Sequence, residues 1–288
     1  MKRFCIPLML GWVTCCAQTT AFAQEFRDHI KKEFVLSKPA AQNVLSIYNL
    51  SGSIKVESYT GDKVIMEIDE KMTAKNEAEL EKGKKEFKMM FEQNEDTVLF
   101  YILEPYDTRA YLERRRERDS REIKYHFTLD FVLKVPASMN LNVSTVTDGD
   151  VDIKDVSGKL SAFNVNGSIK ISNARNTTNA HTINGNVTIN YLENPKEESK
   201  YYTLNGDLRI TYLPDLSADM EFKSMNGNFY TDFTNVEVLP IRITKTKEQE
   251  GSGTVYRLGK NRDLRIGNGG KTFKFETLTG NVYIKKQL

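Results

Sequence analysis

The sequence predicts an all-β protein, a β-solenoid similar to a right-handed β-helix, with one minor helical insertion. Three observations lead to this prediction: a short phrase with Asn-Gly at its centre recurs, apolar residues alternate after each Gly, and the copies are almost evenly spaced. The glycines of the central copies are Gly149, Gly167, Gly185, Gly206 and Gly227. Such a period is typical of stacked repeats, in which each unit buries its apolar face only against its neighbours.

Each copy of the phrase predicts a strand, a turn and a second strand. Gly allows the chain to bend, and the Asn or Asp before it tolerates left-handed conformations. Apolar residues stand two and four positions after Gly and two positions before it, as do Val187, Ile189 and Ile183 around Gly185. Period-two alternation predicts that these residues point into a narrow core. A series of Asn-Gly hairpins is the alternative. The copies are Leu50–Val56, Thr147–Ile153, Val165–Ile171, Ile183–Ile189, Leu204–Ile210, Met225–Thr231 and Leu278–Ile284.

Residues 1–23 have the pattern of a secretory signal peptide. Lys2 and Arg3 precede an apolar stretch, and Ala21-Phe22-Ala23 resembles a cleavage site. The apolar stretch is shorter than the ~20 residues that span a bilayer. A lipid anchor at Cys15 or Cys16 is the alternative, but the residues before them fit it poorly. We therefore expect export to the periplasm or the cell surface, with no transmembrane segment in the mature chain.

The composition of the mature chain excludes several kinds of site. Removal of the signal leaves 24–288, which is long enough to form one domain with a sizeable core. The three cysteines all lie within the signal, so disulfides and thiolate metal sites are excluded from the mature chain. Without Lys2 and Arg3 the basic residues of the mature chain equal its acidic residues in number. A net charge of zero argues against a nucleic-acid partner.

The remaining elements follow in chain order. Residues 44–69 predict two or three strands, 71–92 a helix or a helix followed by a strand, and 97–103 and 123–135 further strands; the repeat core covers about 141–235. The arginine-rich segment Arg109–Arg121 predicts either a polyanion-binding patch or a solvated loop whose acidic residues neutralise the arginines. A second polar loop is expected over Lys245–Asn261.

Several segments together resemble a known bacterial family. The segments that carry the resemblance are Val135–Val143, Gly149–Ile153, Val156–Gly158, Gly52–Val56 and Asp62–Met66. They resemble the β-strand-repeat adhesin family, exported proteins of unknown function that are also similar to the head domains of autotransporter-type adhesins. The resemblance covers about 44–285 and implies a repeat fold and an adhesin-like role. The family offers no established catalytic residues to carry over.

Candidates for metal binding and catalysis are few. His29, His126 and His181 have no second histidine or cysteine at ligand spacing, and no Gly-x-Ser-x-Gly motif is present. Alternating carboxylates at Asp148, Asp150 and Asp152, with Asp155 nearby, predict a possible site for a hard cation such as Ca²⁺. The alternative is that these charges cap the first repeat and protect its edge. We expect no cofactor and no transition-metal site.

Aromatic residues provide the candidate binding residues. Tyr191, Tyr212 and Phe233 each lie six positions after a repeat glycine, and Tyr230 is close by in the sequence. Aromatic side chains stacked on an open face can bind sugar rings or a partner protein. The alternative is that this column closes the hydrophobic core at a corner of the repeats.

These observations predict an exported, non-catalytic interaction protein, adhesin-like, that binds an unidentified glycan or envelope protein. One alternative is a polysaccharide-acting enzyme on a β-helix scaffold, with a cleft formed by the two long loops. The other alternative is a structural component of an envelope complex.

Overall fold

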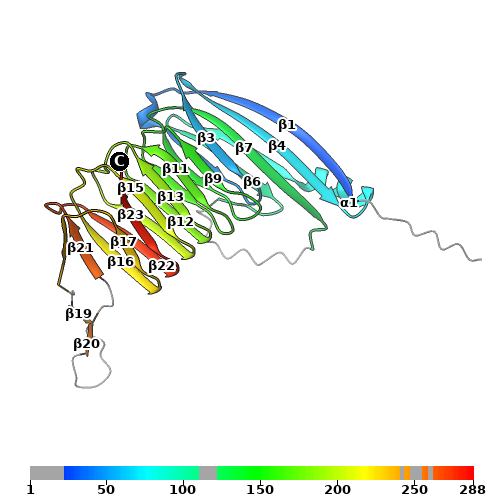
Figure 1. The fold of residues 1–288 in the computed structure, drawn as a ribbon. Coiled ribbons are helices and arrows are strands. Elements are labelled where there is room, and N and C mark those ends of the chain that lie inside the picture. The colour runs from blue at the N-terminus through cyan, green and yellow to red at the C-terminus, as the bar shows by residue number, and fades with distance from the viewer. Residues whose placement is uncertain (1–22, 110–121, 241–242, 247–254, 259–261) are drawn as a thin grey trace, which may run out of the picture.

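The computed structural model describes residues 23–109, 122–240, 243–246, 255–258 and 262–288. Over these residues the chain is nearly all β, with one α-helix, α1 (Glu77–Glu86), and a short 3-10 turn, η1 (Ala40–Gln42) (Figure 1). The strands form two large mixed sheets and a separate two-stranded ribbon. The all-β prediction and the prediction of one helical insertion are confirmed for this part of the chain. The predicted signal peptide, with its three cysteines, lies almost entirely outside it.

The first sheet has ten strands. In spatial order they are β1 (Gln24–Val35), β4 (Lys63–Ala74), β7 (Tyr125–Pro136), β3 (Ile54–Tyr59), β9 (Val151–Lys154), β11 (Ile169–Ala174), β13 (Val187–Tyr191), β15 (Leu208–Tyr212), β23 (Val282–Lys286) and β17 (Phe229–Thr231).

The second sheet has eleven strands. In spatial order they are β18 (Val236–Val238), β21 (Arg262–Ile266), β16 (Ala218–Asn226), β22 (Thr272–Thr279), β14 (Ser199–Asn205), β12 (Thr178–Asn184), β10 (Leu160–Phe163), β8 (Asn140–Ser144), β2 (Val44–Tyr48), β6 (Thr97–Glu104) and β5 (Lys88–Gln93). The ribbon pairs β19 (Ile243–Thr246) with β20 (Val255–Leu258).

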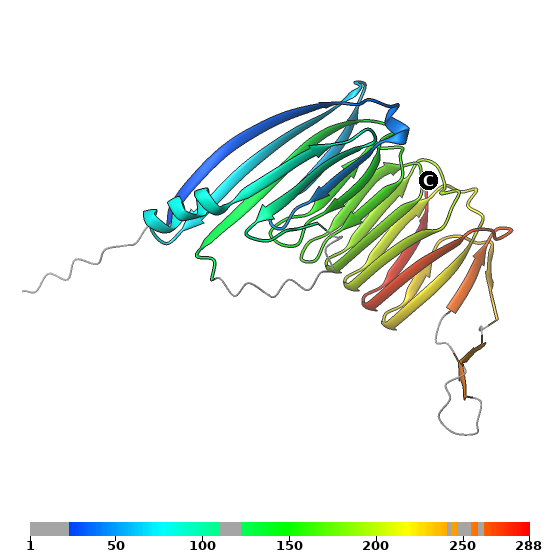
Figure 2. The ribbon, with the colours of Figure 1, turned by 180° about the vertical axis from the view of Figure 1, so that it is seen from behind.

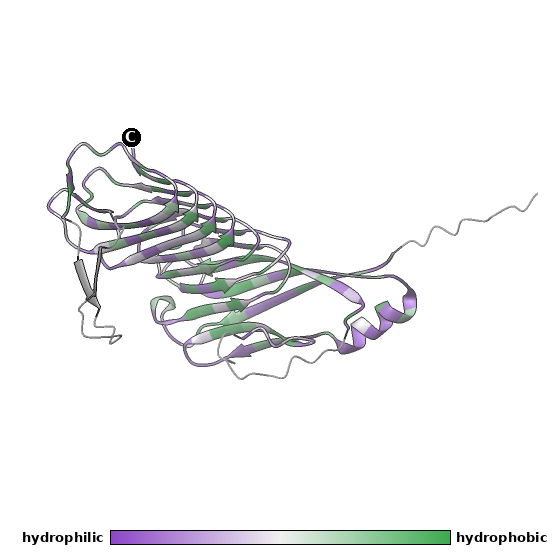
Figure 3. Cartoon of the chain, turned by 90° about the horizontal axis from the view of Figure 1, so that it is seen from below, coloured by the Kyte–Doolittle hydropathy of each residue, from purple (hydrophilic) through white to green (hydrophobic). Residues whose placement is uncertain are grey.

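In the central part of the chain each repeat contributes one strand to each large sheet. Ile169 lies opposite Val151 on one side and Val187 on the other, and all these pairings are parallel. In the second sheet β10 is likewise parallel to both β8 and β12. Figure 3 shows the successive strands stacked behind one another, with hydrophobic positions recurring along the stack. Because neighbouring repeats pair in parallel, the alternative of an antiparallel Asn-Gly hairpin series is wrong.

The copy of the phrase nearest the C-terminus lies inside the stack and not beyond it. β22 and β23 pair on one side with β14 and β15, and on the other with β16 and β17, although β16 and β17 precede them in the sequence. The chain therefore leaves the stack after β17 and returns to insert its last repeat between two earlier ones.

The end of the stack nearer the N-terminus is formed by antiparallel strands instead. β1, β4 and β7 form a long antiparallel set, and α1 lies at its far end (Figure 2). The Asn76 side chain accepts a hydrogen bond from the Glu79 backbone N–H at 2.9 Å and caps the helix. The predicted helical range 71–92 is divided between β4, α1 and β5. Phe87 ends the helix in an extended conformation, and its ring contacts Phe127 at a centroid distance of 4.4 Å.

The core lies between the two sheets and consists of inward columns of aliphatic residues. The positions two and four after each glycine are buried as predicted; Val187, Ile189, Leu208 and Ile210 are all 0% exposed. The prediction for the position two before glycine is wrong, because Ile183 is only half-buried and Met225 is 76% exposed. The residue three before glycine is buried there instead, as at Thr182 and Thr203.

The repeat glycines form a column in which neighbouring backbones touch. A Cβ on Gly185 would lie 2.2 Å from the carbonyl oxygen of Gly167, and one on Gly206 would lie 2.0 Å from that of Gly185. Gly280 and Gly227 continue the column, with corresponding distances of 1.8 Å and 1.7 Å. Any side chain at these positions would push two repeats apart. The column therefore sets how closely the strands stack.

Buried polar side chains donate hydrogen bonds to the backbone carbonyls of this glycine column. The hydroxyl groups of Thr182 and Thr203 each donate to the carbonyl of a glycine in the preceding repeat, at 2.8 Å. Asn164 donates its amide to the carbonyl of Gly149 at 3.0 Å in the same way. Buried polar groups are tolerated where they are satisfied, so these residues fix the register between repeats.

The assignment of inward and outward faces can be tested with two neighbouring substitutions. Ile189→Ala should lower the free energy of unfolding by ~2–5 kcal/mol, because it removes a fully buried side chain and leaves a cavity. Thr188→Ala, at a half-buried position on the other face, should change it little. Denaturant unfolding measures both, and two equally mild variants would contradict the assignment.

A second test concerns the glycine column. Gly185→Ala should destabilise the protein by about 3 kcal/mol or more, because the new methyl group overlaps the Gly167 carbonyl and the strands must separate. Asn190→Ala, at an exposed position of the same repeat, is the control and should cost under about 0.5 kcal/mol. A Gly185→Ala protein as stable as this control would show that the close stacking is not required.

Candidate ligand-binding surface

Two of the aromatic residues predicted to bind a ligand lie inside the core. Tyr191 and Tyr212 are 1% and 0% exposed, and their rings stack at a centroid distance of 5.1 Å. Their hydroxyl groups form hydrogen bonds with that of buried Tyr201, at 2.8 and 2.9 Å. Burial raises the pKa of all three phenols well above its usual range. Phe233 is also buried, at 6% exposed. These three predicted residues close the core, which was the structural alternative, and offer no open face to a ligand.

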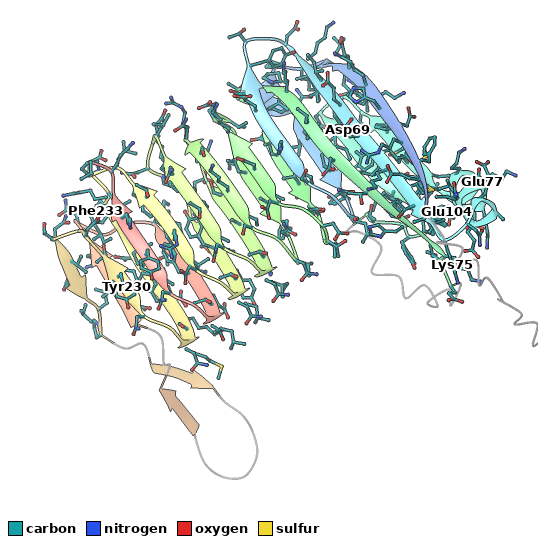
Figure 4. The ribbon with its side chains drawn as sticks, turned by 45° about the vertical axis from the view of Figure 1, so that its right-hand side comes forward. Asp69, Lys75, Glu77, Glu104, Tyr230 and Phe233 are labelled. Atoms are coloured by element: carbon teal, nitrogen blue, oxygen red, sulfur yellow. The ribbon has the colours of Figure 1, made fainter. Side chains whose placement is uncertain are left out.

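Tyr230 is the one predicted aromatic residue that the structure exposes, at 47%. It lies on the first sheet (Figure 4). Tyr283 of β23 is opposite it, and the two rings stack at a centroid distance of 5.0 Å with an interplanar angle of 12°. The guanidinium of Arg209 lies 4.3 Å from the centre of the Tyr283 ring. This small cluster lies near the end of the first sheet and presents two tyrosine rings, one exposed and one half-buried.

The carboxylates predicted to hold a cation act instead as hydrogen-bond acceptors between repeats. Asp148 accepts from the Ser51 hydroxyl at 2.8 Å and lies 3.4 Å from Nε2 of His126. Asp150 accepts from the backbone N–H of Ser168 at 2.7 Å. Within the described ranges, no three carboxylate, imidazole or thiol groups gather where they could hold a metal ion. Asp148 and Asp150 thus join neighbouring repeats inside the stack. The alternative that they protect an exposed edge is wrong, because β9, which follows them, pairs with β3 on one side and with β11 on the other.

The same role continues along the stack at the position after each glycine. The Asn186 side chain accepts from the backbone N–H of Asp207, and Asp207 accepts from that of Asn281, at 2.8 and 2.9 Å. The position before glycine forms a second ladder, in which Asn205 donates to Asn184 and Asn184 to Asn166, each at 2.8 Å. The recurring Asn-Gly phrase is therefore explained by contacts between repeats.

The outer face of the second sheet carries three aromatic side chains in consecutive repeats: Phe163, His181 and Tyr202, here called the aromatic stripe. Phe163 lies opposite His181 in the β10–β12 pairing, and His181 lies opposite Tyr202 in the β12–β14 pairing. The ring centroids are 5.8 Å and 4.2 Å apart. Phe163 is 40% exposed, and the other two side chains are half-buried. Parallel pairing in register is what aligns the three rings.

A shallow depression of about 370 Å³ lies over the aromatic stripe. Its lining adds Asn179, Lys200, Lys274 and Glu276 to the three rings. The ammonium groups of Lys200 and Lys274 lie 3.3 and 2.9 Å from the carboxylate of Glu198, and Glu276 is paired with Lys223. The surface thus combines aromatic faces with charged groups that each lie in an ion pair. Such a combination suits an uncharged ligand that has both apolar and hydroxyl faces.

The aromatic stripe has a signal in the sequence, because its three residues occupy the same position of the repeat. Phe163, His181 and Tyr202 each stand four positions before a repeat glycine, and the next repeats have Glu276 and Lys223 there. The residues six positions after glycine, Tyr191, Tyr212 and Phe233, are aromatic as well. Counted from glycine, they continue the series two, four and six, whose side chains face the core, and this parity explains their burial.

A second depression, of about 300 Å³, lies beside α1 and is lined mainly by charged residues, among them Lys82, Lys85, Lys88 and Glu104. Most of the predicted arginine-rich patch, residues 110–121, lies outside the described residues. Arg109 is described, and its guanidinium forms an ion pair with Asp107 at 2.6 Å. Of the loop predicted over 245–261, only 245–246 and 255–258 are described, and they belong to the β19–β20 ribbon. No helix in the described part of the chain has the length and hydrophobicity to cross a membrane.

The sequence matches no protein-family model, and no curated protein matches it. Similar solved structures include a "putative cell adhesion protein" from Clostridium sporogenes, 10% identical, covering 92% of this chain and 100% of that one with a TM-score of 0.43. A "putative adhesin" from Bacteroides fragilis is 12% identical, with coverages of 90% and 97% and a TM-score of 0.38. A "putative lipid binding protein" from Parabacteroides distasonis is 8% identical, with coverages of 91% and 97% and a TM-score of 0.24. At these scores the likeness carries no role over to this chain.

The surroundings of His181 and His29 shift the pKa values of the two imidazoles in opposite directions, and an NMR titration can measure both. His181 should titrate below the usual 6.5, because burial in the aromatic stripe removes its ring from water and lowers its pKa. His29 should titrate above 6.5, because its ring is hydrogen-bonded to the Asp69 carboxylate at 2.7 Å and this raises its pKa. A His181 resonance that titrated at or above 6.5 would contradict the described packing of the stripe.

Proposed function

We propose that this protein is an exported, non-catalytic binding protein, adhesin-like, that holds a glycan along the aromatic stripe. The observation that carries the proposal is the alignment of Phe163, His181 and Tyr202 on three consecutive strands, beneath a depression with polar sides. Sugar rings present apolar C–H faces that stack on aromatic rings and hydroxyl groups that bond to polar side chains. An extended glycan can therefore contact successive strands in the same way.

The scaffold that we propose for this role is a β-solenoid of the right-handed β-helix kind. In its support, each central repeat adds one parallel strand to each sheet, and the glycine column continues through seven copies of the phrase. Such a scaffold keeps outward residues in fixed columns, as repeated binding contacts require.

The proposed location is the periplasm or the cell surface, reached through the signal peptide over residues 1–23. The charged groups that line the depression support binding over catalysis, because Lys200, Lys274 and Glu276 are all held in ion pairs. A polysaccharide-acting enzyme remains the competing proposal, and release of reducing or unsaturated sugars from mixed glycans would favour it. A structural component of an envelope complex would instead co-purify with a membrane partner.

The test of the proposal is a glycan array beside a panel of extracellular-matrix proteins, probed with the exported chain. Tyr202→Ala should weaken glycan binding by roughly tenfold or more, because it removes a stacking face at the centre of the surface. Tyr230→Ala, on the other sheet, is the matched control and should bind as the wild type does. Both variants should show wild-type thermal unfolding, which separates loss of binding from loss of the fold.

Two results would contradict the proposal. The first is binding only to matrix proteins, and the second is glycan binding that survives Tyr202→Ala but fails in Tyr230→Ala.

A further inference from the structure

The outermost strand of the first sheet, β1, has an unpaired edge. It pairs with β4 along all twelve residues, and in the described part of the chain no strand pairs with its other side (Figures 1 and 2). Unpaired edges of this length are templates for adding another strand. The question is which strand fits.

Two hydrogen bonds show which backbone groups face the free edge. The N–H of His29 donates to its neighbouring Asp28 carboxylate at 2.8 Å, and the carbonyl of Val35 accepts from the Gln93 side chain at 2.6 Å. In an antiparallel ladder the N–H and C=O of one residue point to the same side, and this side alternates along the strand. The odd-numbered residues of β1 therefore direct their backbone groups to the free edge.

The even-numbered residues of β1 place a row of apolar side chains on one face of the strand. The same face carries two charged side chains that have no ion-pair partner among the described residues. Phe26, Ile30 and Phe34 are half-buried against the core. Asp28 lies opposite Glu70 of β4, a like charge whose pKa is raised by burial and by Asp28. Lys32 lies over the Phe91 ring at 5.4 Å. Among the described residues, neither Asp28 nor Lys32 has an ion pair.

We propose that β1 pairs edge to edge, antiparallel, with β1 of a second copy of this chain, about a two-fold axis at Ile30. In this register the numbers of any two residues that lie opposite one another add up to 60. Phe26 then faces Phe34 of the second copy, and Ile30 faces itself. Asp28 faces Lys32, and Arg27 faces Glu33, each pair occurring twice because of the symmetry.

Neighbouring registers lack this complementarity. A shift of the register must keep odd-numbered residues opposite odd-numbered residues, because only these direct their backbone groups to the free edge. The numbers of two facing residues therefore always add up to an even sum. A sum of 58 places Arg27 opposite Lys31 and Glu25 opposite Glu33, and a sum of 62 places Lys31 opposite itself. Like charges directly opposite one another are destabilising in a sheet. In the proposed register the one unfavourable pairing is His29 with Lys31, whose charges are already paired with Asp69 and Glu67 of β4.

A charge exchange measured by sedimentation velocity tests the proposal. The exported wild-type chain should dimerise, and Asp28→Lys or Lys32→Asp should each weaken the dimer about tenfold, because each places two like-charged pairs across the axis. The double variant should restore dimerisation. Lys170→Asp, at an exposed position in the middle of the same sheet, should leave it unchanged.

Thermal unfolding separates this effect from damage to the fold. At concentrations where the protein is monomeric, Asp28→Lys should unfold at the wild-type temperature or above, because it replaces a like charge beside Glu70. A wild-type chain that stays monomeric overturns the proposal, and so does a double variant that dimerises no better than either single variant.

Cross-linking tests the axis itself. Residues 24–288 contain no cysteine, so a cysteine placed there is unique in the exported chain. Ile30→Cys should form a disulfide-linked dimer on mild oxidation, because facing residues at a non-hydrogen-bonded pair lie ~4.5 Å apart at Cα, within disulfide range. Lys32→Cys, on the same face, should not, since two copies of residue 32 would be four positions apart. Equal cross-linking of both variants would overturn the proposed register.

Discussion

The close stacking of the repeat glycines determines how the other residues of each repeat are placed. Each glycine lies against the backbone of the next repeat, at a distance that no Cβ could share. Because the backbones are in contact, the residues near each glycine form defined hydrogen bonds to the neighbouring repeat. The residue before glycine forms an amide ladder, the residue after it accepts from the next backbone N–H, and the residue three before it bonds to a glycine carbonyl inside the core. The stack therefore gains its register from polar groups and its stability from aliphatic columns.

A fixed register turns sequence positions into surface columns. Because the same position of every repeat lies at the same place on its sheet, three aromatic residues four before glycine become a continuous stripe. The same constraint explains how the last repeat can insert between two earlier ones. Any segment with the phrase, such as Leu278–Ile284, presents the same glycine, the same ladders and the same inward residues, so its place in the stack is not tied to its place in the chain.

Sequence patterns could predict the part of the structure that depends on periodicity. The aliphatic residues two and four after glycine are buried as predicted, and the helix forms within the predicted range, at Glu77–Glu86. The position two before glycine was misjudged because the chain bends there and the inward parity passes to a threonine or asparagine, as at Thr182. Polar residues in a core escape a search based on hydrophobicity. Their partners are backbone carbonyls of another repeat, which no local pattern reveals.

The sequence predicts that aromatic residues form the candidate site, but it does not predict which of them lie at the surface. Aromatic residues were expected to bind, yet Tyr191 and Tyr212 continue the inward parity and are buried, while Tyr202 projects from the other sheet. Strand pairing alone brings Tyr202 beside His181, although the two belong to different repeats of the sequence. The first repeats illustrate the same limit, because Asp148 and Asp150 are close in sequence but are hydrogen-bonded to different neighbouring repeats, at Ser51 and Ser168.

If the stacked strands are a rigid scaffold whose second sheet holds the ligand on its outer face, a bound glycan should protect the backbone of that sheet. Hydrogen–deuterium exchange of the exported chain, free and saturated with the tightest glycan from the array, measures this protection. We expect slower exchange over residues 160–163, 178–184 and 199–205, with the first sheet unchanged. Slower exchange confined to the first sheet or to the region beside α1, with these three strands unaffected, would contradict it.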